Sequence, residues 1–212
     1  MHDLVPGVLR HVLEHEPGAT YAYTNAGHLL LGIAIETITG QSYEDYCEAA
    51  VLRPHGIKDA RLHPTWGVLG SFGGWNLSGP EYLAFLGILR SGTSLSAETR
   101  QWLESSTGKL TTPGGPVFYS LLLVRPLSGG DYNFFHTGSW GYRTPPTSTS
   151  GSRNDSVGTL AVSAAFGASW FVSYEPRPDQ EARNALDREL YHAAQGVRTW
   201  PEGNLYVPLG LR

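Results

Sequence analysis

The amino-acid sequence predicts an α+β domain, with helices in the first half of the chain and an antiparallel sheet in the second. Before residue 112, apolar residues recur at helical spacing in segments that end at Gly or Pro. From residue 113 onward, apolar and aromatic residues fall in short runs typical of strands. The chain also holds 26 Gly, 14 Pro and 6 Trp, which favours a loop-rich mixed fold over a plain helical bundle.

The first half contains several segments with helical signals. Residues 4–15 carry apolar side chains at helical spacing, which predicts a short amphipathic helix before a Pro-Gly pair. Residues 27–40 are nearly all apolar, and this pattern predicts a buried helix. Ser78 and Glu81 have the spacing of a capping box at the start of a later helix. Further helices are expected over residues 43–52, 79–90 and 96–103.

The second half is predicted to form a small antiparallel sheet, followed by one helix. Its strand-like runs cover residues 116–124, 131–138, 158–166 and 169–174, and the helix covers 179–195.

No linker divides the chain, so residues 1–212 are interpreted as a single domain. Within it we expect a helical part (1–112), a part with the strands and the last helix (113–195) and a tail (196–212).

Composition excludes some classes of function. Charged residues make up 16% of the chain and the formal net charge is -4, so no basic surface is expected to hold nucleic acid. No apolar run reaches membrane-spanning length, and no basic region precedes an apolar stretch at the start. We therefore expect no membrane span and no signal peptide in the chain as given. The sequence predicts no compartment.

A first candidate site is the pattern His11-Val12-Leu13-Glu14-His15. On a helix, His11 and His15 would lie one turn apart with a carboxylate beside them, as in some zinc peptidases. However, the pattern lies at the chain start before Pro17, and no downstream helix offers a clear third ligand. An accidental pair on a solvated face is the favoured interpretation, and we expect no metal and no cofactor.

A second candidate is Tyr23-Thr24-Asn25, in a polar loop just before the apolar helix. A tyrosine and an amide in this pattern can serve proton transfer and substrate orientation. In the structural alternative, Tyr23 packs on the helix while Asn25 caps its first turn.

A third candidate is His136-Thr137-Gly138-Ser139, at the end of a predicted strand. Gly138 would let a substrate approach the strand closely, and the backbone N–H of Ser139 could point into an oxyanion hole. The alternative is an edge strand that runs into a glycine-containing turn.

Together, in this order, these segments resemble the penicillin-recognising serine hydrolases, which include class C β-lactamases, DD-peptidases, D-aminopeptidases and esterases. The most specific part is PGATYAYTNAGHLLLGIAIETITGQSYEDYCEAAVLRPHGIKDARL, and the similarity extends over roughly residues 10–195. The resemblance implies a β-lactamase/transpeptidase-like fold, in which an antiparallel sheet is flanked by helices beside a helical subdomain. It also implies acyl-enzyme chemistry on an ester, amide or peptide.

The resemblance assigns roles to individual residues. Tyr23 would match the tyrosine of the Y-x-N motif as general base or acid, and Asn25 would match its substrate-orienting amide. His136 stands where many relatives have the lysine of K-T-G. Because H-T-G occurs among peptidase-like and esterase-like relatives, an efficient β-lactamase is not expected. Thr137 would contact the substrate carboxylate or a neighbouring polar group, and Gly138 and Ser139 would complete the binding strand.

The nucleophile is the main departure from the family. Its S-x-x-K motif should come well before Y-x-N, but none of the 22 residues before Tyr23 is a serine. The chain has two lysines, Lys58 and Lys109, and only Lys109 has a serine three positions earlier, Ser106. We interpret this match as accidental, because it follows Y-x-N and lies between a helix end and a Gly-Pro-rich segment.

Two hypotheses therefore remain beside the zinc peptidase. The chain is either a truncated member of the family, inactive alone, or a non-catalytic relative that binds peptides or small amides. Truncation would leave a sheet edge unpaired and an apolar surface exposed. An N-terminal fragment and a second copy of the chain are the macromolecular partners left open.

Overall fold

A computed structural model describes residues 2–92, 94–105, 109–112, 115–120, 122–144, 153–201 and 203, with residues 144, 153 and 154 described by their backbone alone. The chain divides into two compact units. The first comprises Met1–Gly138 and Thr159–Val172, and the second comprises Ser139–Gly158 and Ser173–Arg212.

The predicted α+β class is confirmed. The α-helices are α1 (Val5–Leu9), α2 (Ala26–Thr39), α3 (Tyr43–Cys47), α4 (Gly79–Ser91), α5 (Ala97–Glu104) and α6 (Gln180–Gly196), and α3 continues into a π-helical turn, η2 (Glu48–Leu52). Short 3-10 helices cover His2–Leu4, Arg53–His55 and Gly67–Leu69. The strands are β1 (Arg61–Leu62), β2 (Trp75–Asn76), β3 (Phe118–Tyr119), β4 (Leu123–Pro126), β5 (Tyr132–Thr144), β6 (Arg153–Ser163) and β7 (Ser169–Tyr174).

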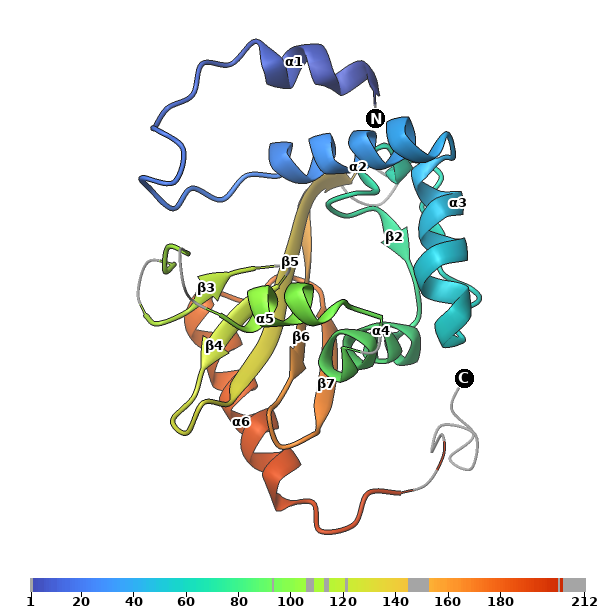
Figure 1. Ribbon diagram of the computed structural model, residues 1–212. Helices are drawn as coiled ribbons and strands as arrows, with labels where there is room; N and C mark the ends of the chain where they lie inside the picture. The colour runs from blue at the N-terminus through green and yellow to red at the C-terminus, as the bar shows by residue number, and fades with distance from the viewer. Residues whose placement is uncertain are drawn as a thin grey trace. The chain divides into compact units, whose positions relative to one another are not determined.

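The predicted helix over residues 4–15 is wrong beyond Leu9. Helix α1 has five residues, and residues 10–25 form a long loop that leads to α2 (Figure 1). No residue of α1 is buried, and Val12 and Leu13 are exposed. Short helices are marginal in water without tertiary packing, so helical spacing alone does not extend this one.

Helix α2 forms as predicted, but the expectation that it is buried is wrong. It ends at Gly40, whose φ of 67° lies in the left-handed region that glycine adopts without strain. Only Leu29 and Gly32 are buried, whereas Leu31 is 64% and Ile38 is 84% exposed. Figure 1 shows α2 beside α3. The reason is that an apolar helix is buried only where other elements cover it, and the described residues cover one side of α2.

The capping box at α4 is confirmed. Ser78 Oγ accepts a hydrogen bond from Glu81 N, while the Glu81 carboxylate accepts from Ser78 N at 2.9 Å. These bonds, with the hydrogen bond from Asp59 N, lower the pKa of Glu81 although burial opposes them. The cap fixes where α4 begins, close to the residues that follow the 3-10 helix Arg53–His55.

The main sheet has five strands in the order β3-β4-β5-β6-β7. Strands β3, β4 and β5 form an antiparallel meander in which Phe118 pairs with Val124 and Val124 with Phe134. All three side chains are at most 1% exposed, so this register places them in one row that faces the core. Among the described strands, β3 and β7 form the two edges of the sheet.

The core of the first unit joins this row to helices α4 and α5. Leu86 and Leu103 pack against it at 1% and 0% exposure. Arg90 of α4 adds polar contacts, because its guanidinium donates to Tyr132 O at 3.1 Å and to Ser163 Oγ at 3.1 Å. Burial lowers the pKa of Arg90. These contacts hold α4 against strands β5 and β6.

The second unit contains the far part of the β5–β6 pair and the C-terminal helix. Tyr142 Oη donates to Glu175 Oε1 at 2.7 Å, and Arg177 N donates to Ser156 O at 3.1 Å. Helix α6 begins at Asp179, whose carboxylate accepts from the third residue along. Across the ranges described above, no helix combines the length and the apolar character needed to cross a membrane.

Candidate active site

The Y-x-N segment lies in the loop that enters α2. Tyr23 Oη donates a hydrogen bond to Asn25 Oδ1 at 2.9 Å. Asn25 is the N-cap residue, yet its side chain makes no capping bond, and Thr24 Oγ1 instead accepts from Ala26 N at 3.1 Å. The alternative in which the Asn25 side chain caps the helix is therefore wrong. Its amide oxygen is held by the phenol of Tyr23.

His136 lies on β5 and is tied to the first strand of the sheet. Its Nε2 lies 3.1 Å from Tyr119 Oη, and the two rings meet edge to face with centroids 6.3 Å apart. The strand pairing brings the two residues close along the sheet. Tyr119 pairs with Leu123, Leu123 pairs with Phe135, and His136 follows Phe135 directly.

Tyr119 also contacts the Y-x-N segment and helix α2. Its ring centroid lies 5.9 Å from that of Tyr23 and 6.2 Å from that of His28. Two of the predicted site residues, Tyr23 and His136, thus lie against the same tyrosine ring. We call Tyr23, Asn25, His28, Tyr119 and His136 the tyrosine-histidine cluster.

The surroundings favour the neutral forms of Tyr119 and His136. The pKa of Tyr119 is raised to about 12, mainly by burial and further by the neighbouring phenols of Tyr23, Tyr21 and Tyr82. Burial, followed by the nearby His28, lowers the pKa of His136. The pair therefore consists of a protonated phenol and an uncharged imidazole at neutral pH.

His28 contributes an unsatisfied polar atom. Its Nδ1 is buried without a hydrogen-bond partner among the residues that the structure describes. Buried polar atoms are normally satisfied by protein, water or ligand. This nitrogen can therefore form one more hydrogen bond beside the ring of Tyr119.

The rest of the H-T-G-S motif continues along β5. Gly138 belongs to the first unit, where a Cβ at this position would lie 2.7 Å from Thr159 Oγ1. This close approach of the neighbouring strand is a packing reason for glycine. Thr137 is half-buried, whereas Ser139 is exposed and belongs to the second unit.

The structure does not support the other candidate sites suggested by the sequence. His11 and His15 lie in the loop after α1, so the expected spacing of one helical turn is wrong. The described part of the chain holds no group of three His, Cys, Asp or Glu suited to a metal. Ser106 lies outside the described residues, while Lys109 Nζ donates to Ser105 O at 2.7 Å.

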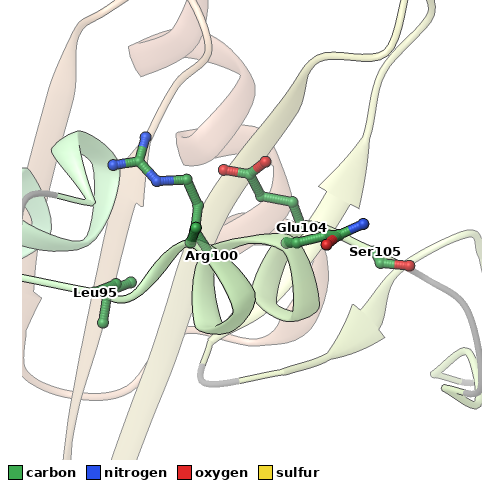
Figure 2. Close-up of a pocket in the computed structure, with 6 residues that line it drawn as sticks. Leu95, Arg100, Glu104 and Ser105 are labelled. Atoms are coloured by element: carbon green, nitrogen blue, oxygen red, sulfur yellow. The ribbon is translucent and has the colours of Figure 1, made fainter.

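A shallow, open depression of about 610 Å³ lies along α5. Figure 2 shows Arg100 and Glu104 projecting from this helix toward the same side. The depression is lined by Leu95, Ala97, Arg100, Gln101, Glu104 and Ser105. None of these residues belongs to the tyrosine-histidine cluster. The hydrogen-bonded cluster is therefore the better candidate for chemistry.

Sequence reasoning missed Tyr119 and His28. Tyr119 lies in an apolar, strand-like run, where a tyrosine is an ordinary residue, and its contact with His136 depends on the register of two strand pairs. His28 is three residues beyond Asn25 on the first turn of α2, and this helical spacing was the one available signal.

A comparison with protein families identifies the family of this chain. The profile of the Beta-lactamase family matches residues 2–192, which is most of the chain. The chain therefore belongs to the β-lactamase family of hydrolases, and the resemblance inferred from the sequence is confirmed.

Individual relatives cover the chain in part. An Escherichia coli (strain K12) protein named as a D-alanyl-D-alanine carboxypeptidase is 33% identical over 57 residues, which are 27% of this chain and 13% of that protein. Among solved structures, the octameric penicillin-binding protein homologue from Pyrococcus abyssi has a TM-score of 0.52 at 21% identity, covering 68% of this chain and 36% of its own.

A second structural neighbour is the D-amino acid amidase from Ochrobactrum anthropi SV3, complexed with L-phenylalanine amide. It has a TM-score of 0.52 at 18% identity and covers 73% of this chain and 54% of its own. These likenesses establish the β-lactamase/transpeptidase-like fold. The chain spans about half or less of the length of the relatives it matches.

Proposed function

We propose that this chain forms the substrate-binding and proton-transfer part of a β-lactamase-family serine hydrolase that cleaves ester, amide or peptide bonds. The observation that carries the proposal is the contact of both Tyr23 and His136 with the ring of Tyr119. Family membership over residues 2–192 supports the same chemistry.

The nucleophile of this enzyme is proposed to come from polypeptide outside these 212 residues. No S-x-x-K motif precedes Tyr23, and the single later match, Ser106 to Lys109, follows it. Acyl transfer through a covalent intermediate needs an activated nucleophile, so the chain alone is expected to be inactive.

In the proposed mechanism, a serine hydroxyl attacks the substrate carbonyl and forms an acyl-enzyme, which water then hydrolyses. Tyr23 moves the proton from the nucleophile to the leaving group, and Asn25 orients the substrate. The N–H groups of Ser139 and of the nucleophile would stabilise the oxyanion. His136 and Thr137 would contact the substrate beside the strand.

The substrate class is proposed to be amides or peptides, with simple esters as alternatives. Two relatives carry the names of a carboxypeptidase and an amidase, which supports amide chemistry. An uncharged His136, in place of the lysine of K-T-G, argues against efficient β-lactam hydrolysis.

Binding without catalysis is the second candidate function. Tyr23 is 57% exposed, and the buried His28 Nδ1 has no partner in the described part of the chain. An exposed Tyr23 ring and an unused hydrogen-bonding atom of His28, on two rings that both contact Tyr119, suit a small aromatic amide.

Mass spectrometry and turnover assays distinguish these proposals. The chain alone, incubated with a p-nitrophenyl ester, should show neither an acyl adduct nor turnover. The same chain joined to the S-x-x-K segment of a close relative should hydrolyse short p-nitrophenyl esters or D-amino-acid amides. A stoichiometric adduct on any serine of this chain, Ser106 included, would contradict an external nucleophile. Saturable binding of D-phenylalanine amide without turnover in the joined protein would favour the binding role.

A further inference from the structure

Tyr119 occupies the centre of the tyrosine-histidine cluster, although no motif in the sequence marks it. Its hydroxyl lies 3.1 Å from His136 Nε2, and its ring contacts those of Tyr23 and His28. It is the cluster member that contacts both the Y-x-N loop and the H-T-G strand.

The chemistry of the two groups indicates the direction of their hydrogen bond. A protonated phenol is a good donor, while a neutral imidazole has one nitrogen that accepts and one that donates. With the pKa of Tyr119 at about 12 and that of His136 below its ordinary value, both groups are uncharged at neutral pH. In this state the phenol O–H can donate to Nε2, with the imidazole proton on Nδ1.

We propose that Tyr119 is a positioning residue, whose phenol O–H donates a hydrogen bond to His136 Nε2 and thereby fixes the imidazole of His136 as the Nδ1–H tautomer. The inference rests on the proposed function in one respect, because it takes His136 as a site residue. It goes further by stating what His136 offers a substrate, namely a single N–H donor on an uncharged ring.

The bond favours the neutral imidazole over the cation. Protonation of His136 would place a hydrogen on Nε2, so the phenol proton of Tyr119 would lose its acceptor and the hydroxyl would have to turn and accept instead. Within the described ranges, the other titratable groups that face the pair are Tyr21 and Tyr23 of the loop, His28 of α2 and Tyr82 of α4. None of them is an acid with an ordinary pKa below neutrality that could stabilise the cation.

Nuclear magnetic resonance of the 15N-labelled chain tests the proposal directly. Long-range 1H–15N correlations of the His136 ring should show an unprotonated Nε2 and a protonated Nδ1 at neutral pH. In Tyr119→Phe, the ring is kept but the donor is lost, so the Nδ1–H population should fall. The pKa of His136 should rise by roughly 0.5 to 1 pH unit, the equivalent of one neutral hydrogen bond.

Tyr132→Phe is the matched control. It removes another phenol hydroxyl from the same unit, one that donates to Glu104 Oε1, and it should leave the ring signals of His136 unchanged. An equal change in both variants would show a general effect of the substitution and overturn the proposal.

A protonated Nε2 in the wild-type chain would also overturn it, as would an unaltered tautomer and pKa in a folded Tyr119→Phe. Should that variant not fold, the wild-type tautomer decides alone. Because these signals are read without turnover, they are independent of hydrolysis. A joined protein that lacks activity would count against the proposed function and leave the tautomer result standing.

Discussion

The phenol of Tyr23 donates a hydrogen bond of 2.9 Å to the amide oxygen of Asn25, two residues along the chain. This bond uses the Asn25 side chain within the Y-x-N segment and leaves the start of α2 to Thr24. The phenol of Tyr23 and the amide of Asn25 are therefore oriented together in the loop before α2, where Tyr23 is exposed.

Replacing Tyr23 by Phe should abolish most of the activity of the chain joined to an S-x-x-K segment. Proton transfer by a placed side chain typically contributes a hundredfold or more, so kcat should fall by about that factor. His136→Ala should cost less, because water can partly replace its contacts. Steady-state kinetics on a p-nitrophenyl ester measures both effects, and Tyr46→Phe serves as the control. Normal turnover with Phe at position 23 would make Tyr23 a packing residue.

Stability should depend on pH through His136. Its pKa is lowered in the folded chain by burial and by His28, whereas the unfolded chain keeps an ordinary value of about 6.5. Between these two values the unfolded chain binds more protons. The stabilising contribution of neutral His136 to the free energy of unfolding is thus fully present above about pH 6.5. It is lost as the pH falls through the pKa of His136 in the folded chain.

Urea unfolding at a series of pH values measures this dependence. His136→Gln should flatten the curve below about pH 6.5, whereas His192→Gln, at an exposed position of α6, should not. Parallel curves for wild type and His136→Gln would mean that this imidazole titrates alike in both states.

Gly138→Ala should destabilise the chain by about 1–3 kcal/mol, because its Cβ would lie 2.7 Å from Thr159 Oγ1. Thr159→Ala should relieve part of this loss in the double variant, and a double-mutant cycle isolates the coupling between the sites. Gly87→Ala is the control. It lies in α4, where a Cβ would meet nothing within 4 Å apart from the backbone of its own helix, and the substitution should stabilise the chain by about 0.5–1 kcal/mol. Additive effects at 138 and 159 would argue against this contact.

The exposed side of α2 should make the isolated chain self-associate or bind a hydrophobic dye. Leu31 and Ile38 are 64% and 84% exposed on this helix. Replacing both by Gln should reduce dye fluorescence and association in gel filtration, whereas Trp200→Gln, outside this helix, should change them little. A sharp monomer peak without dye binding in the wild-type chain would contradict the prediction.

Local signals in the sequence determined the fold class and several element boundaries. The spacing of Ser78 and Glu81 predicted the start of α4, and the apolar run at 169–174 coincides with β7. Such features depend on neighbours within a few residues, so the sequence contains their whole cause. The family motifs likewise identified Tyr23, Asn25 and His136 as site candidates.

Only the tertiary structure decided how far α1 extends, how much of α2 is buried and which residue joins the two motifs. A helical pattern does not show whether another element will cover it, and α1 and the outer side of α2 lack such cover within the described residues. The contact of Tyr119 with His136 requires the β3–β4–β5 meander, whose register places Tyr119, Leu123 and Phe135 side by side, with His136 next along β5. That register follows from the burial of Phe118, Val124 and Phe134 in a shared core, a cause that belongs to the folded chain as a whole.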